Sequence, residues 1–147
     1  MKNILFMDQQ HEAFYRDMIK EFTDRNGGRA PDVYQEAMAY TLGLTEETRR
    51  HAGSIFNLKE NGIEPAALIA PWQTSTTRKV TRLAFNLWNG FTSKVESDES
   101  EEDGYRIGET DPGFAVDNIF CSSLGRYFFE AIKLRYPEYN REELEGR

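Results

Sequence analysis

The sequence predicts a mainly α-helical protein, a compact single-domain bundle of about five to seven helices. Three observations predict this fold class. The chain has 147 residues, 39% of them hydrophobic, which is enough for one domain to bury a core without disulfides or metals. Its apolar residues recur at the i, i+3, i+4 spacing of a helix face and form no run of membrane length. Cap residues, glycines and prolines divide the periodic stretches. We therefore treat residues 1–147 as one helical domain.

The first two helices are predicted by their boundaries and their apolar spacing. Asp8 can cap a first helix that ends at residues 26–28, Asn-Gly-Gly. Pro31 and Asp32 suit the first turn of a second helix, and Gly43 lies just past its end. The inward residues are Phe14, Tyr15, Met18, Ile19 and Phe22 in the first helix, and Tyr34, Ala37, Met38 and Thr41 in the second.

A third helix is predicted to follow at once. Thr45 can cap it, and we expect Ala52, Ile55 and Phe56 to face inward before it ends. Residues 61–62, Asn-Gly, then make a turn. Pro65 and Pro71 bracket a short helical turn.

Residues 71–90, PWQTSTTRKVTRLAFNLWNG, are predicted to form the central helix, preceded by a polar, hydroxyl-rich turn. Asn89-Gly90 has the residue types that adopt the left-handed conformation at a helix end. Apolar side chains fall on one side of the helix and cations on the other, as the 3.6-residue period requires. The apolar side holds Val80, Leu83, Ala84, Leu87 and Trp88.

The remaining elements surround an acidic segment, residues 93–112, that we expect to be a loop insertion. Residues 91–95 and 105–107 can pair as a small β-hairpin around it, although two strands alone are marginally stable. A short helix should follow Pro112 or Gly113, and Ser122 or Ser123 can cap a last helix that Pro137 ends. Residues 140–147 are polar and are expected to form a flexible tail.

The turn that opens the central helix is a candidate anion site. Backbone N–H groups at a helix N-terminus lack intrahelical partners and attract anions. The hydroxyls of Thr74, Ser75 and Thr76 and the two cations Arg78 and Lys79 crowd this end of the helix with further donors. The alternative is structural, because Ser and Thr caps are how many helices begin. The candidate ligand-binding residues are Trp72, Gln73, Thr74, Ser75, Thr76, Arg78, Lys79 and Arg82.

The acidic segment is a candidate partner-binding surface. It contains eight acids and two cations, and therefore carries −6 of the chain's net charge of −7. Such a run is either a solvated, mobile loop or a surface that mimics nucleic acid and attracts a basic partner. The same charge argues against direct binding to DNA or RNA. The candidate partner-binding acids are Glu96, Asp98, Glu99, Glu101, Glu102 and Asp103.

Signals of catalysis and of metal binding are weak. His11 and His51 lie on separate predicted helices, and we expect His11 in an exposed first turn and His51 at the surface or an interface. Cys121 is interpreted as a packing residue. We expect no metal and no cofactor, and favour a non-enzymatic protein. An enzyme stays open as an alternative because three carboxylates could meet in space: Glu36, Glu130 and Glu138.

Two aromatic residues fall outside the apolar stripes of their helices. Phe85 and Phe129 are each either buried against a third helix or part of a contact surface, and we favour burial in a multi-helix core. A contact surface would allow a homo-oligomer. The apolar cluster within residues 1–7 is too short for a signal-peptide core, which predicts the cytoplasm of a host cell, with no membrane partner.

Two segments, WQTSTTRKVTRLAFNLWNG and IFCSSLGRYFFEAIKLRYPEY, carry a resemblance to a known family. Similarity is weaker at QQHEAFYRDM and YQEAMAYTLGL. The chain resembles uncharacterised small proteins found on phages and integrative elements of gut-dwelling Gram-positive bacteria. The acidic segment departs from that pattern, in which the connection is shorter and less charged. No activity is established for the family, so the resemblance implies only a context in which accessory proteins often antagonise host defence.

These observations lead to three functional expectations. The first is a non-enzymatic mobile-element protein that binds and inhibits a host defence factor, with a CRISPR nuclease as one candidate and with the acidic segment contacting a basic surface. The second is a protein that sequesters a nucleotide or second messenger at residues 72–82. The third is a structural, self-assembling phage protein.

Overall fold

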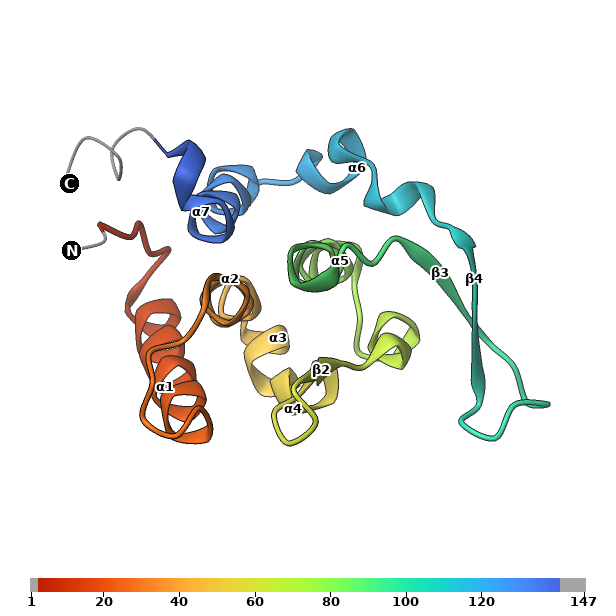
Figure 1. Ribbon diagram of the computed structural model, residues 1–147. Helices are drawn as coiled ribbons and strands as arrows, with labels where there is room; N and C mark the ends of the chain where they lie inside the picture. The colour runs from red at the N-terminus through yellow and green to blue at the C-terminus, as the bar shows by residue number, and fades with distance from the viewer. Residues whose placement is uncertain (1–2, 141–147) are drawn as a thin grey trace.

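The computed structural model describes residues 3–140, in which helices dominate and two short antiparallel hairpins complete the fold (Figure 1). The α-helices are α1 (Gln9–Arg25), α2 (Val33–Leu42), α3 (Glu46–Arg50), α4 (Ala52–Ile55), α5 (Ser75–Asn89), α6 (Val116–Phe120) and α7 (Gly125–Arg135). The strands are β1 (Phe56–Asn57), β2 (Gly62–Ile63), β3 (Ser93–Ser97) and β4 (Tyr105–Thr110). The 3-10 helices are η1 (Pro65–Ile69), η2 (Pro112–Phe114) and η3 (Pro137–Tyr139). The predicted mainly helical single domain is confirmed.

Helices α2 and α5 pack against each other at the centre of the fold. Helix α2 also contacts α1 and α7, and it is buried on nearly every side from Ala37 to Leu42 (Figure 1). Helix α5 contacts α3, α6 and α7 in addition, as expected of a central helix, but keeps one polar face. The sequence of α2 explains its enclosed position, because small and apolar side chains surround the helix and leave little polar surface to solvate.

The caps of α1 and α2 set the corner between them. The Asp8 side chain accepts a hydrogen bond from His11 N, and the helix ends at Asn26, followed by Gly27 and Gly28 at φ values of 71° and 92°. Positive φ favours glycine, so this exit matches the prediction. Asp32, expected inside the first turn of α2, is instead its N-cap.

The predicted third helix is broken. Helix α3 ends at His51, α4 is a single further turn, and Phe56 takes an extended conformation in β1. The extended backbone lets the Phe56 ring reach Phe22 and Trp88, with ring centroids 5.8 and 4.7 Å away. Strand β1 pairs with β2 in a small hairpin that the sequence analysis predicted only as a turn. Tertiary packing therefore overrides the local helical pattern here.

Helix α5 has the predicted boundaries. Its N-cap is Thr74, and it ends at Gly90, which has the left-handed φ of 78°. Phe85 is fully buried, whereas Phe129 on α7 is 58% exposed. The favoured burial is thus confirmed for Phe85 and is wrong for Phe129, which belongs to the surface.

The hairpin around the acidic segment is present and slightly longer than predicted. Val95 of β3 pairs with Ile107 of β4, and β3 lies against η1. Val95 is buried, so it anchors the hairpin to the body. Strand β4 has β3 as its one strand partner in the described chain, and its other edge faces outward (Figure 1).

The C-terminal elements differ from the prediction at one cap. Neither Ser122 nor Ser123 caps α7: its N-cap is Leu124, and the Ser122 hydroxyl accepts a hydrogen bond from the Leu124 N–H before the helix starts. The short helix after Pro112 is confirmed as η2 and α6. Residues 141–147 of the expected flexible tail lie outside the described residues.

Candidate functional site

The polar turn before α5 folds back on itself. The Thr74 hydroxyl accepts a hydrogen bond from Thr77 N at 3.2 Å, and the Thr77 hydroxyl accepts one from Thr74 N at 2.7 Å, which together make a capping box. Gln73 continues the network by donating to Ala67 O at 2.9 Å. These groups stabilise the start of α5. Ser75 and Thr76 are exposed.

The cations of the predicted anion site are bonded within the protein. Arg78 Nε donates to Leu68 O at 3.1 Å, and Lys79 Nζ donates to Cys121 O. Arg82 pairs with Asp111 at 3.3 Å. Each cation therefore ties α5 to a different neighbour: η1, the end of α6, and the end of the acidic segment.

The Trp72 ring also has a stacking partner within the protein. Its ring stacks on the His51 imidazole, with centroids 4.3 Å apart and planes within 5° of parallel. Both rings are half-buried. The candidate ligand-binding residues of this segment therefore have partners within the protein: Trp72, Arg78, Lys79 and Arg82.

The acidic hairpin is ordered at its base by internal ion pairs. Glu96 pairs with Lys94 at 3.2 Å and also with Arg106, and the hydrogen bond from Lys94, followed by the charge of Arg106, lowers the pKa of Glu96. Asp98 accepts hydrogen bonds from the hydroxyl and the N–H of Ser100 at 2.6 and 3.0 Å, which lower its pKa. These two acids are therefore part of the hairpin's own architecture.

The other four candidate acids sit in the connection between β3 and β4 and point to solvent. All are exposed, and no ion pair within residues 3–140 involves them. This connection projects from the helical body (Figure 1). We call this set the tip acids: Glu99, Glu101, Glu102 and Asp103.

A buried polar cluster at the N-terminus was missed by the sequence analysis. His11, expected in an exposed turn, is fully buried. Its Nδ1 accepts a hydrogen bond from Met7 N at 3.1 Å, so Nε2 carries the proton and donates to Tyr40 O at 2.8 Å. Burial lowers the pKa of His11. The signal was present, because His11 stands at helical spacing from Tyr15, on the buried stripe of α1.

The same cluster fixes the extended segment before α1. Leu5 N donates to the Glu130 carboxylate at 2.9 Å, and the Tyr40 hydroxyl donates to Leu5 O at 2.6 Å. Glu130 is 6% exposed and also pairs with Lys133 at 3.0 Å. Burial, and then the Glu130 charge, raise the pKa of Tyr40. Glu130 thus serves to hold the N-terminal segment in place, while Glu138 is exposed elsewhere on the surface.

The described part of the chain offers no metal centre and no membrane span. No three His, Cys, Asp or Glu side chains between residues 3 and 140 are placed to hold a metal ion together. None of the helices there is both long and apolar enough to cross a bilayer. Cys121, interpreted as a packing residue, is exposed, which corrects that interpretation.

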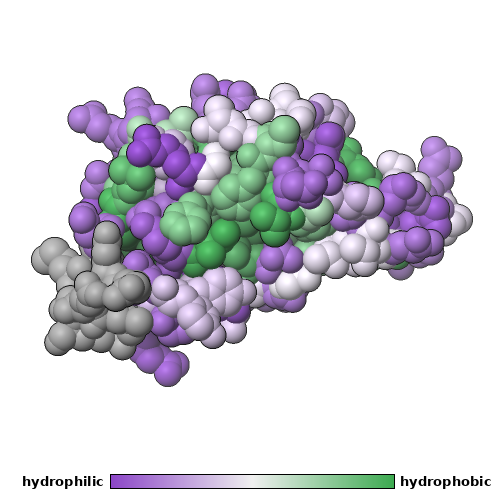
Figure 2. Space-filling model, turned by 90° about the horizontal axis from the view of Figure 1, so that it is seen from above, coloured by the Kyte–Doolittle hydropathy of each residue, from purple (hydrophilic) through white to green (hydrophobic). Residues whose placement is uncertain are grey.

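The face formed by α6 and α7 carries apolar surface. Figure 2 shows apolar side chains across the middle of this face, bordered by polar ones. Phe129 and Val116 are the large apolar residues of these two helices that are exposed, at 58% and 75%. Such a patch is a candidate contact surface.

The described residues thus define a small, mainly helical protein with a projecting acidic hairpin. The chain belongs to the family of unknown function DUF6075, whose model matches residues 1–146. The uncharacterised family expected from the sequence is therefore confirmed. Comparison with the curated proteins and with the solved structures gives no match.

Proposed function

We propose that this protein is a non-enzymatic binding protein that presents its acidic hairpin to a basic surface of a partner protein. The observation that carries the proposal is that some acids of the hairpin have internal partners whereas others are exposed to solvent. Glu96 and Asp98, at the base of the hairpin, bind groups of the hairpin itself and keep its shape. The four tip acids remain exposed to solvent. Clustered charge of one sign attracts a partner of opposite sign over a distance of about 10 Å at moderate salt.

The hairpin also offers short-range contacts. Ile107 on β4 is 52% exposed beside the acidic tip, so it can supply apolar contact once charge has brought the partner close. The outer edge of β4 supplies backbone donors and acceptors. A basic surface with an extended or apolar element next to it is therefore the type of partner that fits.

In the context that the family resemblance implies, the partner is a host defence factor and binding inhibits it. Nucleases that act on nucleic acid present basic grooves, and an acidic hairpin competes with nucleic acid for such a groove. A CRISPR nuclease is one candidate of this type. The site of action would be the cytoplasm of a host cell, with the protein encoded on a phage or integrative element.

The two other expectations have weaker support. A nucleotide held at residues 72–82 would have to displace internal partners, because Arg78 and Lys79 already donate to carbonyl oxygens. A self-assembling structural role would draw on the exposed Phe129 face. The acidic hairpin needs neither displacement nor rearrangement.

The proposal is tested by capturing partners from host lysate with matched charge variants. In the tip variant, each tip acid is replaced by Lys. In the control variant, four exposed acids elsewhere are replaced by Lys, which gives the same change of charge: Asp17→Lys, Asp24→Lys, Glu60→Lys and Asp117→Lys. Capture of a basic protein by the wild type and the control, but not by the tip variant, supports the proposal. Equal capture by the tip variant, or no partner at all, refutes it.

A further inference from the structure

The chain is acidic overall, yet one groove on its surface is lined by cations. The groove lies where α1 ends, α2 begins and the β1–β2 hairpin approaches (Figure 1). It consists of two adjoining pockets of about 440 and 390 Å³ that share Arg25 and Asn26. Each pocket falls within the range of about 300–1,000 Å³ that small-molecule sites occupy.

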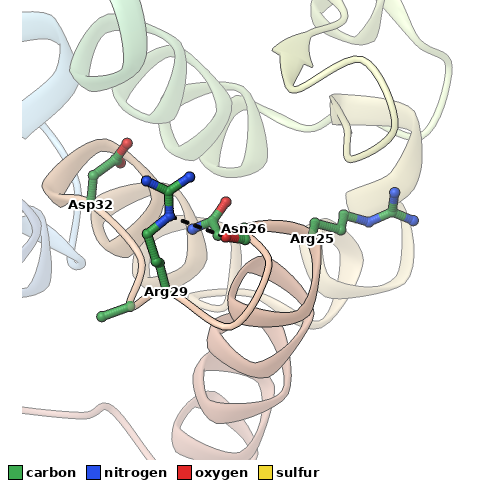
Figure 3. A pocket seen from close by; sticks show the side chains of 5 residues that line it. Arg25, Asn26, Arg29 and Asp32 are labelled. Carbon is green, nitrogen blue, oxygen red and sulfur yellow. Dashed lines mark hydrogen bonds between the residues drawn. The ribbon is translucent and has the colours of Figure 1, made fainter.

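The cations come from three separate segments. Arg25 ends α1, Arg29 follows in the connection to α2, and Lys59 lies in the β1–β2 turn. Figure 3 shows Arg25 and Arg29 on opposite sides of Asn26, whose backbone oxygen accepts a hydrogen bond from Arg29 Nε at 3.5 Å. Arg25 lines both pockets and Arg29 lines the first. Arg25 has only a 3.7 Å ion pair with Glu21, and no ion pair in the described chain involves Arg29 or Lys59.

One acid lines the groove itself, and its carboxylate already accepts a capping hydrogen bond. Asp32 lines the first pocket, and its Oδ1 accepts the N-cap hydrogen bond from Gln35 N at 2.8 Å. The carboxylate is thus held by the start of α2. The groove keeps an excess of positive charge in a protein whose net charge is −7.

Asn26, which lines both pockets, is held in place by a pair of amide hydrogen bonds. Asn26 Nδ2 donates to Gln35 Oε1 at 2.8 Å, and Gln35 Nε2 donates to Asn26 Oδ1 at 3.2 Å. Gln35 is 4% exposed. This amide pair fixes the turn that carries Arg29, so binding does not have to order the backbone first.

The second pocket has both apolar and polar lining residues. Phe22 and Leu58 supply the apolar part, which we call the apolar floor, and Arg25, Lys59 and Asn61 supply polar groups, which we call the rim. A ligand that matches both parts has an anionic group and a compact, flat or apolar body. Guanidinium groups favour phosphate because their forked donors match its oxygens.

We propose that this groove binds a small organic phosphate of the nucleotide class. In this proposal the phosphate groups contact Arg25 and Lys59, which line the same pocket, and a longer phosphate chain reaches Arg29 in the adjoining pocket. The base or sugar lies over Leu58, with the Asn61 amide at the rim. This site is separate from the acidic hairpin and from the start of α5, so its test does not depend on either.

The test is calorimetric titration of the purified chain with ATP, AMP, pyrophosphate and citrate at low salt. We expect ATP to bind, and Arg25→Ala and Lys59→Ala each to weaken that binding about tenfold or more. The controls are Arg16→Ala and Lys20→Ala, which remove exposed cations from earlier turns of α1 and should leave the affinity unchanged. Circular dichroism checks that each variant stays folded.

Several outcomes would overturn the proposal. They are no heat with any of the probes, unchanged ATP affinity in both Arg25→Ala and Lys59→Ala, or citrate binding as tightly as ATP. Pyrophosphate binding as tightly as ATP would also overturn it, because the apolar floor would then contribute nothing. Weaker binding of pyrophosphate than of ATP, lost in both groove variants, supports it.

Discussion

Replacing His11 by Phe tests the buried polar cluster at the N-terminus. The variant His11→Phe keeps an aromatic ring in a fully buried position but removes both side-chain hydrogen bonds. Met7 N–H loses its acceptor, which costs about 1–3 kcal/mol. Tyr40 O keeps a second bond, from Gly43 N at 3.2 Å, so losing the His11 donor costs only about 1 kcal/mol. We therefore expect the free energy of unfolding at pH 7.5 to fall by about 2–4 kcal/mol.

The loss of stability in His11→Phe should be smaller at acidic pH than at pH 7.5. Burial lowers the pKa of His11 below the 6.5 that is usual for histidine. Above pH 6.5 the histidine is mostly neutral in both the folded and the unfolded state. Between pH 6.5 and the lower pKa of the folded state, only the unfolded state binds the proton. Wild-type stability therefore falls as the pH drops, by at most about 1.4 kcal/mol at pH 5.5 relative to alkaline pH. His11→Phe has no histidine to protonate at this position. The difference in unfolding free energy between the wild type and the variant therefore narrows by the same amount as the pH falls.

Urea unfolding followed by circular dichroism at pH 7.5, 6.5 and 5.5 measures both effects. The comparison cancels all titrating groups that the two proteins share. A difference in unfolding free energy that stays constant across the three pH values would refute a neutral, buried His11. A loss below about 0.5 kcal/mol at pH 7.5 would show that its hydrogen bonds add little.

Three further predictions concern packing and caps. Phe85→Ala should lower the unfolding free energy by about 3–5 kcal/mol and the exposed Phe129→Ala by less than about 1 kcal/mol, both measured in urea; equal losses would contradict the burial assignment. Thr74→Ala should cost about 1 kcal/mol in the same assay through loss of the capping box, and an unchanged midpoint would argue against that box. Glu130→Leu should speed hydrogen exchange at the Leu5 amide, which loses its acceptor, and unaltered exchange would contradict a role of Glu130 in holding the N-terminal segment.

The helices that the sequence predicts best are those whose caps and apolar period agree. Helices α1 and α5 have an Asp or Thr cap, a full stripe and a Gly beyond the end, so local energies suffice to place them. The break at His51 was not predictable in this way. It depends on Phe56 packing against Phe22 and Trp88, which lie far away in the sequence.

The candidate sites also differ in whether local sequence or the tertiary fold determines them. The charge of the tip acids follows directly from the sequence, and so does their place between two strands. The cations of α5 looked available because their acceptors, Leu68 O and Cys121 O, are backbone atoms that only the tertiary fold brings near. The cationic groove likewise could not be predicted, because Arg25 and Lys59 are far apart in the sequence and only the tertiary fold brings them to one pocket.

The most direct test of the proposed function is the association rate of the wild-type protein with the captured partner, measured between about 50 and 300 mM salt. Recognition by the tip acids predicts a rate that falls steeply with added salt, and a slower, nearly salt-independent rate for the tip variant. A wild-type rate that is equally independent of salt, or a tip variant that matches the wild type throughout, would contradict binding through the acidic hairpin.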